Sequence, residues 1–407
     1  MARRGANQPS VGAFNQAVVL EQIRRSRGMS RVELVGATGL SAQTVSSVCQ
    51  RLLDGGIIVE AERSTSTGRG KPRTILRLVG DSRLAVGVHL DPEVITIVLL
   101  GIDGTMFARV SHAIAATGAP EGILALITDQ IDHLLSAARV DRARIVGIGV
   151  AAPGPIDADR GAVLNPPNLG AWHDVPVRDS MRASTGLPII LDKDVTAAAI
   201  AERWVAPHGD TSFAFLYLGT GVGVGLMIGD DVVRGVSGNA GEIGHLIVDG
   251  DGPPCTCGRR GCVAVTCTPA AVIAEARALG IFPARDAGEA RAAHDGLAAV
   301  AAFAANGDVA AIALLDRVAS RISSMLGVVC NLLDVDRVVL GGPMWTRLAP
   351  WLEGRVPPTL TGQLVADGLH HIVVSGTSLG DDAGAIGAAC LVLDDAMTPR
   401  TASLLLS

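Results

Sequence analysis

The chain has 407 residues, of which 48% are hydrophobic and 18% charged, so it is long enough for two or three domains with sizeable cores. No apolar run reaches the length of about 18 residues that a membrane span needs, and no signal-peptide core follows the start, so we expect no membrane partner and a cytoplasmic location. The net charge of −6 argues against a nucleic-acid partner, but residues 1–79 carry +7 and residues 80–407 carry −13. A basic head is therefore joined to an acidic body.

Three short helices are predicted near the N-terminus. Apolar residues recur at helical spacing over residues 11–26, a second helix follows an N-cap at Ser30, and a third begins at Ser41. The Gly39 turn between the last two gives the helix-turn-helix plan, in which the third helix enters the DNA major groove by its N-terminal residues. The polar residues that this helix offers are Gln43, Thr44, Ser46, Ser47 and Gln50. We predict that they contact phosphates and base edges.

Two strands, at residues 57–60 and 73–78, flank a polar loop at 64–71 that is typical of a wing. The cations Arg69, Lys71 and Arg73 lie on a Gly/Pro-extended backbone, which is slim enough to enter an A·T-rich minor groove. Double-stranded operator DNA is therefore the predicted partner, and a homodimer or higher homo-oligomer is expected because two heads read a pseudo-palindrome. The alternative is a small packing module with a solvated basic hairpin.

The acidic body contains one α/β unit twice. Strands at 84–90, 94–100 and 107–115, a helix at 121–138, strands at 144–150 and 189–191 and a helix at 195–204 form the first copy. The second begins with strands at 213–218 and 224–228 and ends with strands at 337–340 and 371–374 and a helix at 382–393. We predict three domains: a winged helix-turn-helix at 1–80, an N-terminal α/β lobe at 81–207 and a C-terminal α/β lobe at 208–407. Two facing lobes bind ligands in the cleft between them.

An ordered set of motifs makes the chain recognisable. It comprises Asn165-Pro-Pro-Asn168 with Trp172, Leu191-Asp-Lys-Asp194, the loop Gly219-Thr-Gly-Val-Gly-Val-Gly225, Gly241-Glu242-Ile-Gly-His245, Cys255-Thr-Cys257-Gly-Arg-Arg-Gly-Cys262, Leu340-Gly-Gly342 and Gly380 to Gly387. In this set the chain resembles the ROK family of repressors, uncharacterised reading frames and sugar kinases over nearly its whole length. The resemblance implies an α/β class fold: the N-terminal winged helix of the family's transcriptional regulators, followed by a duplicated actin-like (RNase H-like) sugar-kinase fold.

One imidazole and three potential thiolates gather in a short stretch: His245, Cys255, Cys257 and Cys262. This set satisfies a closed tetrahedral Cys₃His site, so we predict a structural zinc ion that fixes the loop carrying Glu242. Four unrelated buried residues are the alternative. The family resemblance implies that His245 also contacts a sugar, which would couple the metal loop to the ligand site.

The resemblance also assigns a catalytic residue. In the family's kinases the residue matching Asp194 takes the proton from the attacking sugar hydroxyl, and Gly-rich loops hold ATP. The loop Gly219 to Gly225 is present, but the kinase pattern Asp-x-Gly-Gly-Thr is replaced by Asp91-Pro-Glu93-Val-Ile95. Without the glycines, and with an added carboxylate at Glu93, the loop is unsuited to phosphates. We therefore expect no enzyme activity, with Asp194 vestigial.

The predicted ligand residues are Asn168, Lys193, Asp194, Glu242 and His245. Lys193 replaces an Asn of the family pattern and Ala264 replaces a Glu, which implies a different ligand, weak binding or none. The leading hypothesis is a DNA-binding transcriptional regulator, a repressor by the commoner family role, that responds to a sugar or sugar phosphate. The alternatives are an active ATP-dependent sugar kinase with an accessory DNA-binding domain, and a constitutive DNA-binding protein whose polar cleft residues are a remnant of a kinase.

Overall fold

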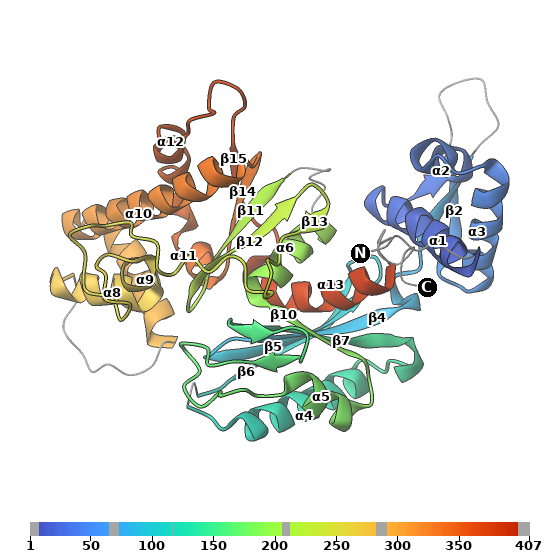
Figure 1. The fold of residues 1–407 in the computed structure, drawn as a ribbon, viewed down its shortest axis with the longest axis horizontal. Coiled ribbons are helices and arrows are strands. Elements are labelled where there is room, and N and C mark those ends of the chain that lie inside the picture. The colour runs from blue at the N-terminus through green and yellow to red at the C-terminus, as the bar shows by residue number, and fades with distance from the viewer. Residues whose placement is uncertain (1–7, 65–72, 116, 206–211, 282–290, 398–407) are drawn as a thin grey trace.

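The computed structural model describes every residue except 1–7, 65–72, 116, 206–211, 282–290 and 398–407. The head lies at one end of the molecule (Figure 1). Its helices are α1 (Gln8–Arg25), α2 (Arg31–Thr38) and α3 (Ala42–Asp54). Its sheet has the order β1-β3-β2, with β1 (Met29–Ser30), β2 (Ile58–Ser64) and β3 (Arg73–Leu78). The predicted helix-turn-helix and the two strands of the wing are confirmed.

Capping residues fix the helices of the head. The Ser30 side chain accepts a hydrogen bond from the Glu33 backbone N–H, and the Glu33 carboxylate accepts one from the Ser30 N–H at 2.8 Å. This reciprocal capping box satisfies two donors at the start of α2 that have no partner within the helix. Ser41 caps α3 by accepting from the Thr44 N–H. Val45 and Val48 are buried at or below 1% exposure, so the opposite face of α3 is left to solvent.

The first lobe of the body is built on a five-stranded sheet with the order β10-β7-β4-β5-β6. The strands are β4 (Leu84–Leu90), β5 (Val94–Gly101), β6 (Met106–Ala113), β7 (Ile145–Ala152) and β10 (Ile189–Lys193). Helices α4 (Pro120–Ala137) and α5 (Val177–Thr185) cover the face of this sheet that lies away from the second lobe (Figure 1). Helix α5 is absent from the sequence prediction.

The second lobe repeats this plan in the order β13-β12-β11-β14-β15. Its strands are β11 (Phe213–Leu218), β12 (Val222–Ile228), β13 (Asp231–Val232), β14 (Arg337–Gly341) and β15 (Val373–Gly376). In both lobes three consecutive strands run antiparallel, and two later strands add in parallel to the other edge of the first strand. The predicted duplication of one α/β unit is therefore confirmed.

Additional helices enlarge the second lobe around its own hydrophobic core. They are α7 (Val263–Thr266), α8 (Pro269–Ala278), α9 (Arg291–Ala305), α10 (Val309–Leu333), α11 (Pro343–Leu352) and α12 (Val356–Thr361). Among the described helices no single one is long and apolar enough to cross a membrane, although the pair Asp295–Ala305 and Val309–Leu333, bent by 117°, passes on length and composition alone.

Two helices lie between the sheets: α6 (Asp194–Val205) and the last helix, α13 (Ala383–Met397) (Figure 1). Helix α13 packs on β4 and β7 of the first lobe. The approach is close, because a Cβ atom on Gly149 would lie 1.7 Å from the Ala388 carbonyl oxygen. Helix α13 thus returns the described chain to the first sheet. The predicted boundary at 207/208 lies outside the described residues, and the domain limits stay a prediction.

Candidate functional site

The first candidate surface is the solvent face of α3. Gln43, Ser46 and Ser47 are exposed, and their side chains make no hydrogen bond to any described residue. Two predicted DNA contacts are already engaged within the helix: the Thr44 hydroxyl lies 2.9 Å from the N-cap hydroxyl of Ser41, and Gln50 donates to Asp54 at 2.8 Å. The α3 face therefore offers three uncommitted polar side chains at the N-terminal half of a capped helix.

The wing is described only at its base. Arg73 begins β3, is 54% exposed and lies 3.8 Å from the Glu33 carboxylate, a weak contact that leaves its guanidinium accessible. The other two predicted wing cations, Arg69 and Lys71, lie outside the described residues.

The second candidate region is the predicted cleft between the lobes, at the turn that joins β4 to β5. This turn closes on itself: the Asp91 carboxylate accepts a hydrogen bond from the Glu93 N–H at 3.0 Å. The Thr220 hydroxyl, from the opposite Gly-rich loop, lies 3.0 and 3.1 Å from the two Asp91 carboxylate oxygens and 3.3 Å from Glu93 Oε1. The two loops that the family resemblance assigns to the nucleotide are thus joined by a hydroxyl and two carboxylates.

Burial shapes the charge of this contact. Asp91 is 8% exposed, and its burial raises the pKa of the carboxyl against the opposing effect of nearby His89. His89 is itself buried, its Nε2 has no partner among the described residues, and its ring meets Tyr217 edge-on at 5.9 Å. A phosphate group placed here would meet acidic side chains instead of backbone N–H groups.

The residues predicted to bind a sugar are centred on Lys193. This lysine is 2% exposed, and its Nζ donates to Glu242 Oε1 at 2.5 Å and to the Ala240 carbonyl at 3.1 Å. Glu242 is 60% exposed, so the pair has one buried and one solvated member. The lysine that replaces the family's asparagine therefore occupies the carboxylate that the resemblance assigns to sugar binding.

Asp194 follows at the first position of α6. Its carboxylate accepts a hydrogen bond from the Val195 N–H at 2.7 Å, and burial raises its pKa, with His89 and Lys193 acting in the opposite direction. Asn168 is exposed on the facing loop, where its Nδ2 would lie 3.9 Å from a Cβ on Gly221. Asp194 therefore lies near the Lys193–Glu242 pair, whereas Asn168 borders the Gly-rich loop.

The predicted metal ligands gather as expected. The ligand atoms of His245, Cys255, Cys257 and Cys262 all lie within 4.8 Å of one another. His245 Nδ1 is 3.5 Å from Cys255 Sγ, and Cys257 Sγ is 3.7 Å from Cys262 Sγ. A tetrahedral site with Zn–S bonds of about 2.3 Å needs ligand separations of about 3.8 Å. The geometry fits a tetrahedral metal ion.

Backbone contacts tie this cluster to the cleft. Gly261, between the ligands, has φ +64°, and a Cβ there would lie 1.5 Å from the Asp249 carbonyl, so no other residue fits. After the last cysteine, the Ala264 N–H donates to the Gly244 carbonyl at 2.9 Å. Gly244 lies between Glu242 and His245 in the sequence, so the Cys₃His cluster and the predicted sugar contact Glu242 are held by the same backbone.

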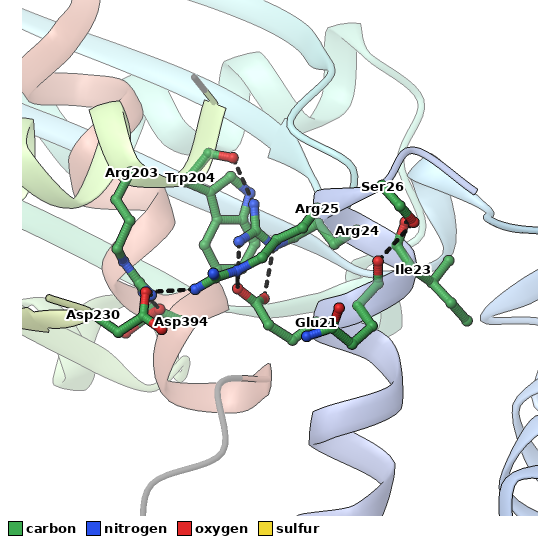
Figure 2. Close-up of polar contacts among 10 residues, drawn as sticks. Glu21, Ile23, Arg24, Arg25, Ser26, Arg203, Trp204, Asp230 and Asp394 are labelled. Atoms are coloured by element: carbon green, nitrogen blue, oxygen red, sulfur yellow. Dashed lines mark hydrogen bonds and ion pairs between the residues drawn. The ribbon is translucent and has the colours of Figure 1, made fainter. Parts of the chain in front are cut away.

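A third polar cluster, at the boundary between head and body, was not predicted from the sequence (Figure 2). Arg24 of α1 is buried, forms a two-pronged ion pair with Glu21, stacks 3.9 Å above the Trp204 ring and donates to the Trp204 carbonyl at 2.5 Å. Burial alone would raise the pKa of Glu21, but the hydrogen bonds and charges of Arg24 and Arg25 lower it to about 2. Because Trp204 belongs to the last turn of α6, the head is attached to the helix that starts at Asp194.

Further ion pairs extend this junction. Arg25 donates to Asp230 at 2.6 Å, and Arg203, which is 8% exposed on its side chain, pairs with Asp394 of α13 (Figure 2). These partners are close to 200 positions apart along the chain. No local sequence pattern signals such contacts.

A winged-helix head on a two-lobed α/β body with a Cys₃His cluster defines a class of protein. Residues 85–395 match the model of the ROK family. The chain belongs to the ROK family.

Relatives with two different activities are similar to it. It is 29% identical over 258 residues to the xylose repressor of Bacillus subtilis (strain 168), covering 63% of this chain and 66% of that protein, just under two thirds of its length. It is 33% identical over 276 residues to a glucokinase of Halalkalibacterium halodurans, covering 65% and 82%. A ROK family transcriptional regulator described as a homologue of the E. coli Mlc protein has a similar fold, with TM-score 0.77 at 19% identity over 98% of this chain and 100% of that one.

Proposed function

We propose that the protein is a cytoplasmic, DNA-binding transcriptional repressor of the ROK family that responds to a sugar or sugar phosphate bound in its cleft. The observation that carries the proposal is the α3 face, where Gln43, Ser46 and Ser47 are exposed and unbonded within the described structure. On a capped helix of a winged-helix head, such side chains suit the major groove. The similarity to xylose repressors supports the same role.

The cleft supports loss of the phosphorylation reaction. Catalysis of phosphoryl transfer depends on preorganised donors and cations around the transferred group. Here the corresponding turn presents Asp91 and Glu93, and Thr220 of the second loop already hydrogen-bonds to them. A nucleotide would have to break this contact and approach two carboxylates.

Helix α6 gives a physical route from ligand to DNA. Its first residue, Asp194, borders the ligand site, and its Trp204 carbonyl and ring hold Arg24 of the head. A sugar that binds one arrangement of the lobes better than another shifts the position of α6 and hence of the head. Such a sugar must also compete with Lys193 for Glu242.

We assign the Cys₃His cluster to a structural zinc ion held by His245, Cys255, Cys257 and Cys262. Four protein ligands leave no open position, so the ion would stabilise the loop and take no part in chemistry. We also propose a homodimer or higher homo-oligomer, because a single winged helix reads too short a site for selective operator binding.

Selection of genomic duplex fragments by the purified full-length protein tests this function. We expect a small set of fragments, bound with an affinity that falls steeply with salt. A panel of hexoses, pentoses and their phosphates is then added to the complex, and at least one is expected to change its affinity. No selective enrichment would contradict the DNA-binding role, and unchanged affinity with every sugar would contradict the response alone.

An active sugar kinase is the second candidate, because Asp194 and the loop Gly219 to Gly225 are retained and a glucokinase is among the relatives. An ATP-consumption assay over the same sugars decides between them. Turnover by the wild type that disappears in the Asp194→Asn variant would establish the kinase. We expect no turnover by the wild type or by the variant.

A further inference from the structure

A cavity of about 650 Å³ lies at the junction of head and body. Its volume is within the range of about 300–1,000 Å³ that is usual for small-molecule sites. The described part of its lining contains five arginines: Arg24, Arg25, Arg27 and Arg77 from the head and Arg203 from the body. Among the described residues of the lining, Asp103 is the single acidic one. The cavity therefore concentrates positive charge between two parts of the chain whose relative position matters for DNA binding.

Three of these arginines are neutralised and two are not. Glu21 pairs with Arg24 and Arg25, and Asp394 pairs with Arg203. Within the described structure, the exposed guanidinium groups of Arg27 and Arg77 have no carboxylate partner and no hydrogen bond. The remaining positive charge thus comes from two side chains of the head that border the cavity.

Other lining residues leave donors unsatisfied. Arg203 Nε and Trp204 Nε1 are buried and have no acceptor among the described residues. Buried donors are nearly always paired in folded proteins, with protein or with bound molecules. The Asp103 carboxylate already accepts hydrogen bonds from the Thr105 N–H at 2.9 Å and from the Thr105 hydroxyl at 3.0 Å. The lining therefore has an excess of donors and calls for a ligand rich in acceptors.

We propose that this cavity binds a phosphorylated small molecule of the size of a sugar phosphate, at a site separate from the cleft. A phosphate group supplies the negative charge and several acceptor oxygens that guanidinium forks recognise. A nucleotide base is disfavoured, because Trp204 is the single aromatic ring among the described residues of the lining and Arg24 stacks over it at 3.9 Å. Of the polar groups of Gly104 and Thr105, the Gly104 carbonyl oxygen makes no hydrogen bond within the described structure and is left for a sugar hydroxyl.

A ligand held by Arg27 and Arg77 of the head and by Arg203 of the body would fix the head against the body. The binding itself does not depend on the proposed repressor function. Its effect on operator affinity does rest on that function, so binding is measured first, without DNA.

The test is calorimetric titration of the full-length protein with glucose 6-phosphate, inorganic phosphate and glucose. The variant is Arg27→Gln/Arg77→Gln, and the control is Arg139→Gln/Arg182→Gln, which removes two exposed arginines of the body. Arg139 matches Arg27 in its positive φ, 53° against 56°. Removal of the two guanidinium groups is expected to weaken glucose 6-phosphate binding by about tenfold or more, because charge-assisted hydrogen bonds are lost. The control is expected to bind like the wild type, and glucose binding is expected to be unchanged.

Several results would overturn the proposal. Absence of glucose 6-phosphate binding, equal binding in both double variants, or binding of inorganic phosphate alone would each contradict a sugar-phosphate site. Binding that glucose displaces, or that Glu242→Gln abolishes, would place the ligand in the cleft. The Arg27→Gln/Arg77→Gln variant could lose affinity for duplex DNA but keep its affinity for glucose 6-phosphate. In that case these arginines bind DNA, and their assignment to a sugar-phosphate site is wrong.

Discussion

Polar side chains on the solvent face of α3 and in the predicted cleft differ in whether they bond to other side chains. On α3, Gln43, Ser46 and Ser47 are exposed and make no side-chain bond within the described structure. In the cleft, Lys193 is bonded to Glu242, and Thr220 to Asp91. Unmade hydrogen bonds on an exposed face are satisfied by water and can be exchanged for a partner at low cost. The head is ready to bind, whereas the cleft must break its own contacts first.

The difference suits the proposed function, in which a chain with a fold shared by kinases binds DNA. A polar network that satisfies itself stabilises the cleft and lowers the gain from any ligand that enters it. Under the proposed function, a sugar that contacts Glu242 must compensate for the lost Lys193–Glu242 pair. Changes to the metal cluster, to the junction and to the cleft are expected to alter the free energy of unfolding by decreasing amounts.

Removal of the metal from the loop beside the predicted cleft is expected to have the largest effect on stability. Cys262→Ser, or treatment with a chelator, is expected to lower the free energy of unfolding by several kcal/mol, because binding energy of a structural zinc is folding energy. Thermal unfolding and metal analysis measure this, with about one zinc per chain expected for four ligands. Cys267→Ala, at a buried cysteine outside the cluster, is the control. A protein that holds no metal and unfolds unchanged with chelator would remove the zinc assignment.

Glu21→Gln acts on the junction that joins the two regions. The carboxylate has a folded pKa of about 2 against 4.5 when unperturbed. Its ion pairs therefore contribute about 3 kcal/mol above pH 4.5, and this contribution is lost as the pH falls from 4.5 through 2. Unfolding measured against pH is expected to show that loss in the wild type and a flatter profile in the variant. The exposed Glu353→Gln serves as control, and equal profiles would contradict the account.

Glu242→Gln tests whether the cleft satisfies itself. Lys193 is 2% exposed and would be left with backbone carbonyls alone. Because Glu242 is 60% exposed and screened by water, we expect a loss of only ~1–2 kcal/mol in the free energy of unfolding. Denaturant unfolding measures it, again against Glu353→Gln. A variant that is as stable as the wild type would show that the pair does not close the cleft.

Asp91→Asn should have the smallest effect. Burial raises the pKa of Asp91, so removal of its charge at pH 7 is expected to stabilise the protein by less than ~1 kcal/mol. The advantage is expected to shrink as the pH falls, because the wild-type carboxyl then becomes protonated and neutral. Unfolding at pH 7 and at lower pH measures the trend, and an advantage that grows with acid would contradict it.

Local patterns predicted most of the elements. Ser30 and Ser41 mark the starts of α2 and α3 because a capping side chain lies within three residues of the groups it satisfies. The Cys₃His cluster could likewise be predicted, since its four members lie close in sequence. Helix α5 was missed, and no side-chain cap marks its start at Pro176.

Long-range contacts could not be predicted in this way. Thr220 and Asp91 are 129 positions apart, and Arg24 and Trp204 are 180 apart. Their pairing depends on how two sheets and a head come together, which hydrophobic periodicity does not encode. The glycine losses at residues 91–95 indicated an impaired phosphate loop, but the contact that closes it needed the structure.

Affinity for a genomic fragment selected by the protein tests the central claim most directly. Binding is compared for the wild type, Gln43→Ala/Ser47→Ala on α3 and Ser136→Ala on α4. We predict a loss of ~1–3 kcal/mol for the α3 variant on the selected fragment, with little change on unrelated DNA, because base contacts carry the specificity. The Ser136→Ala control should bind like the wild type. Equal, sequence-independent binding by all three proteins would contradict the assignment of α3 as the surface that reads operator DNA.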